Sequence, residues 1–188
     1  YHALFREYLL EGLDYPQRSL LLNKAALFYY DQQQYSKAAN MAIFAKNTDI
    51  LQRVVLNSYK SYIGKGKYSE LLSWFNALDN LTAVLSPAVL VAKGALFSSI
   101  GKFNEAKKCL DRALPLLSEN CQALYIEAMI HKARVLRNFI SFEESNKLLD
   151  ELISGLDQLT PDTLYTIVIE KVYNLCWNSQ IREADRLI

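Results

Sequence analysis

The sequence predicts an all-α protein built from stacked antiparallel helix pairs. Three observations support this fold class: one short pattern recurs five times, its period suits a helix pair, and apolar residues flank the copies at helical spacing. Glycine and proline are scarce, with 6 and 4 among 188 residues, which favours helices over turn-rich folds. Because one helix pair cannot bury its apolar face alone, neighbouring pairs must stack to form a core.

The recurring pattern begins with a turn-like or polar pair, followed by a large apolar residue. A charged residue comes two places later, and a small residue usually follows it. The large apolar residues lie 33, 35, 39 and 39 positions apart: Tyr35, Tyr68, Phe103, Phe142 and Ile181. This spacing predicts copies that start near residues 19, 52, 87, 126 and 165, with the last copy truncated.

The third copy defines the repeat unit most clearly. Ser86 and Pro87 predict a helix start, because serine caps helix N-termini and proline is tolerated in the first turn. Gly101 predicts the helix end, where a left-handed backbone is needed. In the middle of this helix Gly94 costs roughly 1 kcal/mol relative to alanine. We therefore expect Ala106 of the second helix to approach Gly94 closely.

The second copy departs from this small-residue contact. Tyr59 and Leu71 occupy the two positions that Gly94 and Ala106 hold in the third copy. We expect looser packing of the helix pair there. Trp74 and Phe75, which follow in the same copy, are expected in the core rather than in a binding site.

Two further helix starts are visible late in the chain. Ser141 and Glu144 have the spacing of a capping box, and Thr160 precedes a proline in the same way as Ser86. No stretch rich in proline, glycine or serine interrupts the chain, so the sequence predicts no internal boundary.

Composition argues against several classes of partner. The 21 basic and 20 acidic residues give a formal net charge of +1, which does not favour nucleic-acid or membrane-surface binding. No apolar run is long enough to span a membrane. Three cysteines without close pairing fit a reducing, cytoplasmic location, and we expect Cys109, Cys121 and Cys176 to be small buried hydrophobic residues.

Catalysis has little support in the sequence. The two histidines, His2 and His131, form no metal-binding spacing with the cysteines, and no nucleophile motif is present. The segment 64–67 indicates a turn between helices rather than a phosphate-binding loop. We therefore expect a non-catalytic chain without cofactor or metal.

The N-terminal part resembles a family of bacterial regulators. The stretch from His2 to Leu9 is similar to the end of the winged-helix segment in MalT-like, ATP-dependent LuxR-type transcription activators, which leads into helical repeats. Segments 22–26 and 71–78 resemble the continuation, although Asn23 and Lys24 replace the His and Arg of the family. The repeats themselves resemble tetratricopeptide repeats. The resemblance assigns residues 1–15 to the tail of a winged-helix segment and 16–188 to the repeats.

This resemblance implies a sensor region within a larger regulator. Such a region forms a right-handed superhelix, binds an inducer or a regulatory protein in its concave groove, and controls self-association of the activator. An NTP-binding domain would precede it, and DNA would be contacted only through a domain absent from this chain. The repeats alone leave open a general scaffold or adaptor that binds a peptide. The truncated last copy is also expected to expose an apolar face near Leu175, Ala184 and Leu187.

The candidate groove residues lie on the inner face of each first helix, as the repeat offsets place them. Arginine and lysine combined with tyrosine and tryptophan suit a polar or sugar-like ligand, or an acidic peptide. The alternative for each residue is an ordinary solvated or packed position. The candidates are Asn23, Tyr30, Arg53, Lys60, Glu127, Arg134, Arg137, Tyr173 and Trp177.

Overall fold

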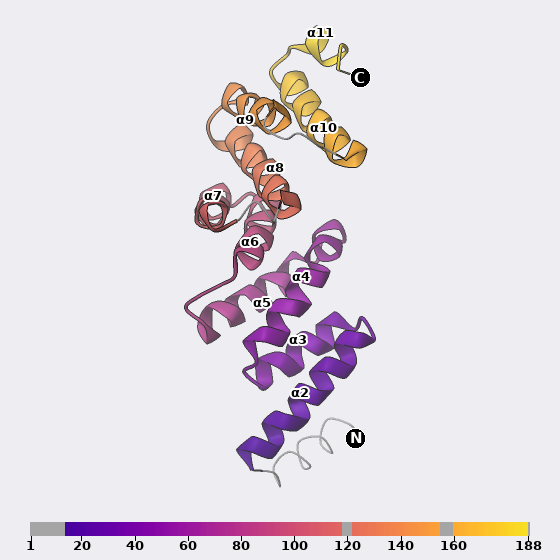
Figure 1. Ribbon diagram of the computed structural model, residues 1–188, viewed down its shortest axis with the longest axis vertical. Coiled ribbons are helices and arrows are strands. Elements are labelled where there is room, and N and C mark those ends of the chain that lie inside the picture. Colours follow the sequence, from indigo (N-terminus) through magenta and orange to yellow (C-terminus); the bar gives the residue numbers. More distant parts are fainter. Residues whose placement is uncertain (1–13, 118–121, 155–159, 188) are drawn as a thin grey trace. The chain divides into compact units, whose positions relative to one another are not determined.

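The computed structural model describes residues 14–117, 122–154 and 160–187. Within these ranges the chain forms ten α-helices, one short 3-10 helix and no β-strand (Figure 1). The all-α prediction is therefore confirmed. The segment that resembles the winged-helix tail, apart from its last two residues, and Cys121 lie outside the described ranges.

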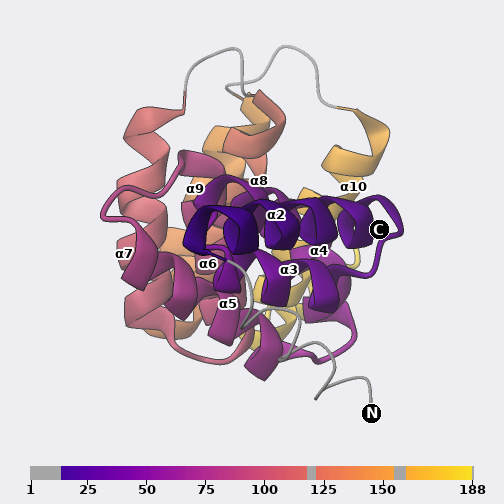
Figure 2. The same cartoon turned by 90° about the horizontal axis from the view of Figure 1, so that it is seen from below.

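The helices follow one another as pairs, and the chain divides at Leu85 and Ser86 into two compact units. The N-unit, described over 14–85, holds α2 (Tyr15–Asp31), α3 (Tyr35–Phe44), α4 (Thr48–Gly64) and α5 (Tyr68–Leu81). Figures 1 and 2 both show α2 and α3 side by side. The C-unit, described over 86–187, holds α6 (Pro87–Ser99), α7 (Phe103–Ala113), the 3-10 helix η1 (Leu114–Leu116), α8 (Gln122–Phe139), α9 (Phe142–Ser154), α10 (Pro161–Trp177) and α11 (Ile181–Ala184).

The division between the units was not visible in the composition. Thr82 ends α5 in an extended conformation, and its hydroxyl accepts a hydrogen bond of 3.2 Å from the backbone N–H of Val84. The connection to α6 is thus a short, locally bonded segment. Such a segment needs no glycine-rich or proline-rich sequence.

The first residue of the recurring pattern forms a left-handed turn in four of the five copies. The backbone φ is +55° at Gln33, +69° at Gly66, +75° at Gly101 and +61° at Ser179. In each of these copies the next N–H reaches back to a carbonyl five residues earlier, at 2.8 to 2.9 Å. This is the hydrogen bond that closes a helix C-terminus around a left-handed residue. The pattern is therefore the signature of the helix–turn–helix joint.

The predicted caps are confirmed. The hydroxyls of Ser86, Ser141 and Thr160 each accept a hydrogen bond from the backbone N–H three residues later. Asp14 and Asn47 cap α2 and α4 in the same way. These two caps were not predicted, and α2 and α4 begin at Tyr15 and Thr48, four residues, about one turn, before the predicted starts of their copies near 19 and 52.

Gly94 is the point of closest approach between α6 and α7. A Cβ atom at Gly94 would lie 2.8 Å from Cγ of Leu110 and 3.5 Å from the carbonyl oxygen of Ala106. The predicted close contact exists, but a leucine side chain fills most of the space that the missing Cβ leaves. In the second copy α4 and α5 pack less extensively than the other long pairs, as Tyr59 and Leu71 predicted.

The N-unit core is aromatic at its centre. Trp74 is 1% exposed and Phe75 is fully buried, which confirms their predicted role. The ring centres of Trp74 and Tyr62 lie 4.9 Å apart, so α5 packs on α4 through an aromatic pair.

Two predictions about the C-terminal end were wrong. Cys109 is buried as expected, but Cys176 is exposed because it lies on the uncovered face of α10. Leu175 and Ala184 are buried at 7% and 2% exposure, since α11 packs on α10 through them. Of the predicted apolar face only Leu187 is exposed. None of the helices described is long and apolar enough to cross a membrane.

Candidate functional site

In the N-unit the candidate residues connect α2 to α4. Asn23 accepts a hydrogen bond of 2.9 Å from the amide of Asn47, and the Tyr30 hydroxyl accepts one of 2.8 Å from Asn57. The guanidinium of Arg53 lies 5.2 Å from the centre of the Tyr30 ring. Lys60 lies two helical turns further along α4, and its Nζ is 5.7 Å from the centre of the Tyr59 ring. The N-unit therefore brings Tyr30 and Arg53 together and leaves Lys60 apart.

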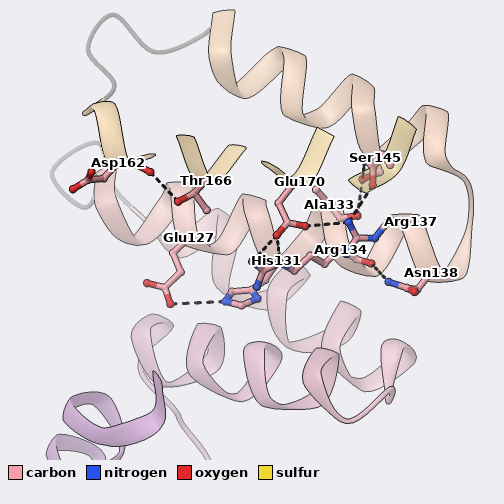
Figure 3. A network of polar contacts seen from close by, with 11 residues as sticks. Glu127, His131, Ala133, Arg134, Arg137, Asn138, Ser145, Asp162, Thr166 and Glu170 are labelled. Atoms are coloured by element: carbon pink, nitrogen blue, oxygen red, sulfur yellow. Dashed lines mark hydrogen bonds and ion pairs between the residues drawn. The ribbon is translucent and has the colours of Figure 1, made fainter. Parts of the chain in front are cut away.

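In the C-unit two candidate arginines converge on one buried carboxylate. Glu170 of α10 is only 6% exposed. Arg134 of α8 donates from Nε and Nη2 to its Oε1, at 2.9 and 2.7 Å, and Arg137 donates from Nη1 to its Oε2, at 3.1 Å (Figure 3). A buried carboxylate is costly unless it is paired and hydrogen-bonded. Here both oxygens are satisfied by guanidinium groups from the neighbouring repeat.

The hydrogen bonds continue from this carboxylate into α9. Asn174, which is fully buried, accepts from Arg137 at 3.2 Å and donates to Ser145 at 2.9 Å and to Asn146 at 2.7 Å. The Ser145 hydroxyl in turn donates to the backbone carbonyl of Ala133 at 2.8 Å (Figure 3). We call these side chains the polar network; they join α8, α9 and α10: Arg134, Arg137, Ser145, Asn146, Glu170 and Asn174.

The ionic part of the network carries an excess positive charge. Two guanidinium groups share one carboxylate, so the three side chains sum to +1. Arg134 is 34% exposed in its side chain and Arg137 is 19% exposed. Both hydrogen bonds of Arg137 use Nη1, and its Nε and Nη2 have no hydrogen-bond acceptor among the described residues. The fixed arginine therefore retains donors that a bound anion could use.

Exposed aromatic side chains flank the network on α10. Tyr173 is 54% exposed and Trp177 is 73% exposed. The Arg137 guanidinium lies 5.9 Å from the centre of the Tyr173 ring. We call Arg134, Arg137, Tyr173 and Trp177 the recognition surface. Four of the nine predicted residues thus meet at one place, on the first helices of the fourth and fifth copies.

Two adjoining hollows open at the recognition surface. One has a volume of about 280 Å³ and is lined by Arg137, Asn138, Phe142 and Glu170. The other has a volume of about 560 Å³, and its lining has no charged side chain: Tyr165, Val168, Ile169, Val172, Cys176 and Leu187. Tyr173 and Trp177 line both hollows. We call them the polar hollow and the apolar hollow.

The ninth candidate, Glu127, lies elsewhere on α8. Its carboxylate is 3.9 Å from Nε2 of His131, away from the arginines (Figure 3). Sequence reasoning missed Glu170, Asn174 and Ser145. A signal was available for the first two, because they fall on the same helical stripe as the buried Ile167. A carboxylate and an amide on a buried stripe require partners, and the arginines one repeat earlier supply them.

No known protein family matches this chain, and no curated protein is significantly similar to it in sequence. Across the described part of the chain, no cluster of three or more histidine, cysteine, aspartate or glutamate residues could hold a metal ion. The functional conclusion therefore depends on the side chains of the recognition surface. They offer oriented positive charge, aromatic faces and an apolar hollow, which are the components of a binding site.

Proposed function

We propose that this chain is a recognition module, the sensor region of a MalT-like LuxR-type transcription activator, which binds an inducer or a regulatory protein at the recognition surface. One observation carries the proposal: exposed Tyr173 and Trp177 lie beside two arginines that are held in place by buried Glu170. Groups fixed before binding lose little conformational entropy when a ligand arrives, so they favour affinity.

The regulatory part of the proposal is supported by the sequence. The stretch from His2 to Leu9 resembles the family segment that precedes the repeats, and the helix pairs follow it in the expected order. In this proposal the pairs continue as a right-handed superhelix whose first helices line the concave side. A ligand would then control self-association by binding one state more tightly than the other.

A peptide-binding scaffold is the second candidate function. It is favoured by the exposure of Trp177, 73%, because a tryptophan that stands open to solvent suits a partner segment as well as a small molecule. Both functions use the same surface and differ in the size of the ligand.

Thermal stabilisation by a metabolite library tests the first function, and capture of peptides from a random peptide library tests the second. We expect at least one hit that is lost in the double variant Tyr173→Ala, Trp177→Ala and retained in Tyr15→Ala, which removes a tyrosine 67% exposed on α2. Aromatic variants are preferred to arginine variants, since removing an arginine would also leave Glu170 with fewer partners. Hits that persist in the double variant would contradict the proposed site for both functions.

A further inference from the structure

The polar and apolar hollows together specify the chemistry of a ligand. Tyr173 and Trp177 line both hollows, so a molecule that contacts these two side chains lies next to both. The apolar hollow, about 560 Å³, lies within the range of small-molecule sites. No charged side chain lines it, whereas the polar hollow presents Arg137 beside Glu170.

The charge beside the polar hollow determines which head group of a ligand is favoured. With Arg134 behind Arg137, two guanidinium groups face one carboxylate, and the excess of +1 favours an anion over a cation or a neutral group. The donors of Arg137 that do not bond Glu170 form a planar fork, which matches the two oxygens of a carboxylate. A ligand with two negative charges would outweigh the excess charge of +1, so a ligand with one negative charge is favoured.

We infer that the site binds an apolar monocarboxylate, a molecule with one carboxylate head and a hydrocarbon body. The head lies in the polar hollow against Arg137, and the hydrocarbon body lies in the apolar hollow along α10. Tyr173 and Trp177 contact the ligand where the two hollows meet. This inference rests on the proposed function and names the ligand class for the same surface.

Decanoate is the probe that tests this assignment on the full chain. Biosynthetic 5-fluorotryptophan gives two reporters, Trp74 in the N-unit core at 1% exposure and Trp177 at the site at 73%. We expect decanoate to shift the fluorine resonance of Trp177 in a saturable way and to leave that of Trp74 unchanged. Calorimetry with hexanoate, octanoate and decanoate should show roughly tenfold tighter binding for each two CH₂ groups added.

The head group is tested on the unmodified protein with decanol and decyltrimethylammonium. We expect decanol to bind at least tenfold more weakly than decanoate, because it lacks the charged hydrogen bonds, and the cation not to bind. Arg137→Gln, which leaves Arg134 paired with Glu170, should weaken decanoate by a similar factor. Lys37→Gln is the matched control, since Lys37 lies over the Tyr29 ring in the N-unit at 5.3 Å; it should leave the affinity unchanged.

Three outcomes would overturn the inference. Decanol that binds as tightly as decanoate would show an apolar surface without anion recognition. Shifts of Trp74 equal to those of Trp177 would show detergent-like unfolding. No binding by any of the carboxylates would remove this ligand class, while library or peptide hits that depend on Tyr173 and Trp177 would leave the proposed function standing.

Discussion

The two units join successive repeats in different ways. In the N-unit the first helices meet through exposed or half-exposed contacts, such as the Tyr30–Asn57 hydrogen bond and the Arg53–Tyr30 stacking. In the C-unit α8 and α10 meet through Glu170, a carboxylate buried at 6% exposure, and through the fully buried Asn174. Arg53 of the N-unit lies over an aromatic ring, whereas Arg137 of the C-unit lies near the Tyr173 ring and is also hydrogen-bonded to a buried carboxylate. The C-unit arginines are therefore held in one orientation by hydrogen bonds to a buried carboxylate, whereas Arg53 of the N-unit has no such partner among the contacts described above.

Among the variants considered, Glu170→Ala should cause the largest loss in the free energy of unfolding. A smaller loss would contradict the difference drawn between the two units. The substitution leaves two arginines without their shared carboxylate, and removing one partner of a buried ion pair destabilises strongly. Because Arg134 is 34% exposed and can turn to water, we expect a loss of about 2 to 3 kcal/mol in the C-unit.

Urea unfolding followed by fluorine signals measures this loss separately in each unit, with Trp177 reporting the C-unit and Trp74 the N-unit. Asn57→Ala, which removes the exposed hydrogen bond to Tyr30, is the counterpart and should cost the N-unit less than about 1 kcal/mol. Equal losses for the two variants would mean that the buried network is no more important than the exposed contact.

A pair of glycine substitutions compares helix contacts in the two units. Gly94→Ala places a Cβ 2.8 Å from Leu110 Cγ, and the overpacking of about 1 to 3 kcal/mol exceeds the helix-propensity gain of about 1 kcal/mol. Gly64→Ala meets no atom within 4 Å and should be neutral or stabilising. Thermal denaturation of both variants checks the sign, and a stabilising Gly94→Ala would show that the α6–α7 contact is not tight.

Left-handed residues at the joints predict stabilising substitutions in both units. Gln33 and Ser179 have φ values of +55° and +61°, and a side chain in this region costs roughly 1 kcal/mol that glycine avoids. Gln33→Gly and Ser179→Gly should therefore each raise the unfolding free energy of their own unit by up to about 1 kcal/mol. Gly101→Ala, at φ +75°, should lower it by a similar amount. A destabilising Gln33→Gly would contradict the joint geometry.

The smallest predicted effect concerns Asp111 in α7. Burial alone would raise the pKa of this carboxyl, but hydrogen bonds and attraction from Lys107 and Lys132 outweigh it and lower the pKa from 3.8. A lowered folded-state pKa stabilises the protein above the unfolded-state pKa and loses that contribution as the pH falls through the folded value. Since Asp111 is 37% exposed, Asp111→Asn should cost only about 0.5 kcal/mol at pH 7. The cost should disappear as the pH falls below the lowered folded-state pKa, and a cost that persisted there would assign the effect to packing.

The sequence predicted the features that depend on one local segment, such as helix caps and turns. It missed the side-chain pairs whose two partners come from different repeats. The Ser86 cap, the left-handed Gly101 and the close approach at Gly94 each follow from one residue type in one local context. The pairing of Glu170 with Arg134 joins residues 36 positions apart, and no local rule links them.

The candidate site shows the same limit. The repeat offsets placed nine residues on one type of helix face, and four of them meet at the recognition surface. The arginines were expected as a ligand-facing or solvated face, but their orientation comes from Glu170, which the offsets did not select. Cys176 was expected in the core because it lies in a helical apolar pattern. It is exposed, since such a pattern does not show which face of α10, the first helix of the fifth copy, is covered by other helices.

Backbone amide chemical-shift mapping of the full chain during titration with sodium decanoate tests the central claim most directly. Our account predicts saturable shifts confined to the C-unit residues that line the two hollows, centred on Arg137, Tyr173 and Trp177, with no saturable change around Tyr30 and Arg53. Saturable shifts centred on the N-unit, or shifts spread evenly over both units, would contradict a recognition site in the C-unit.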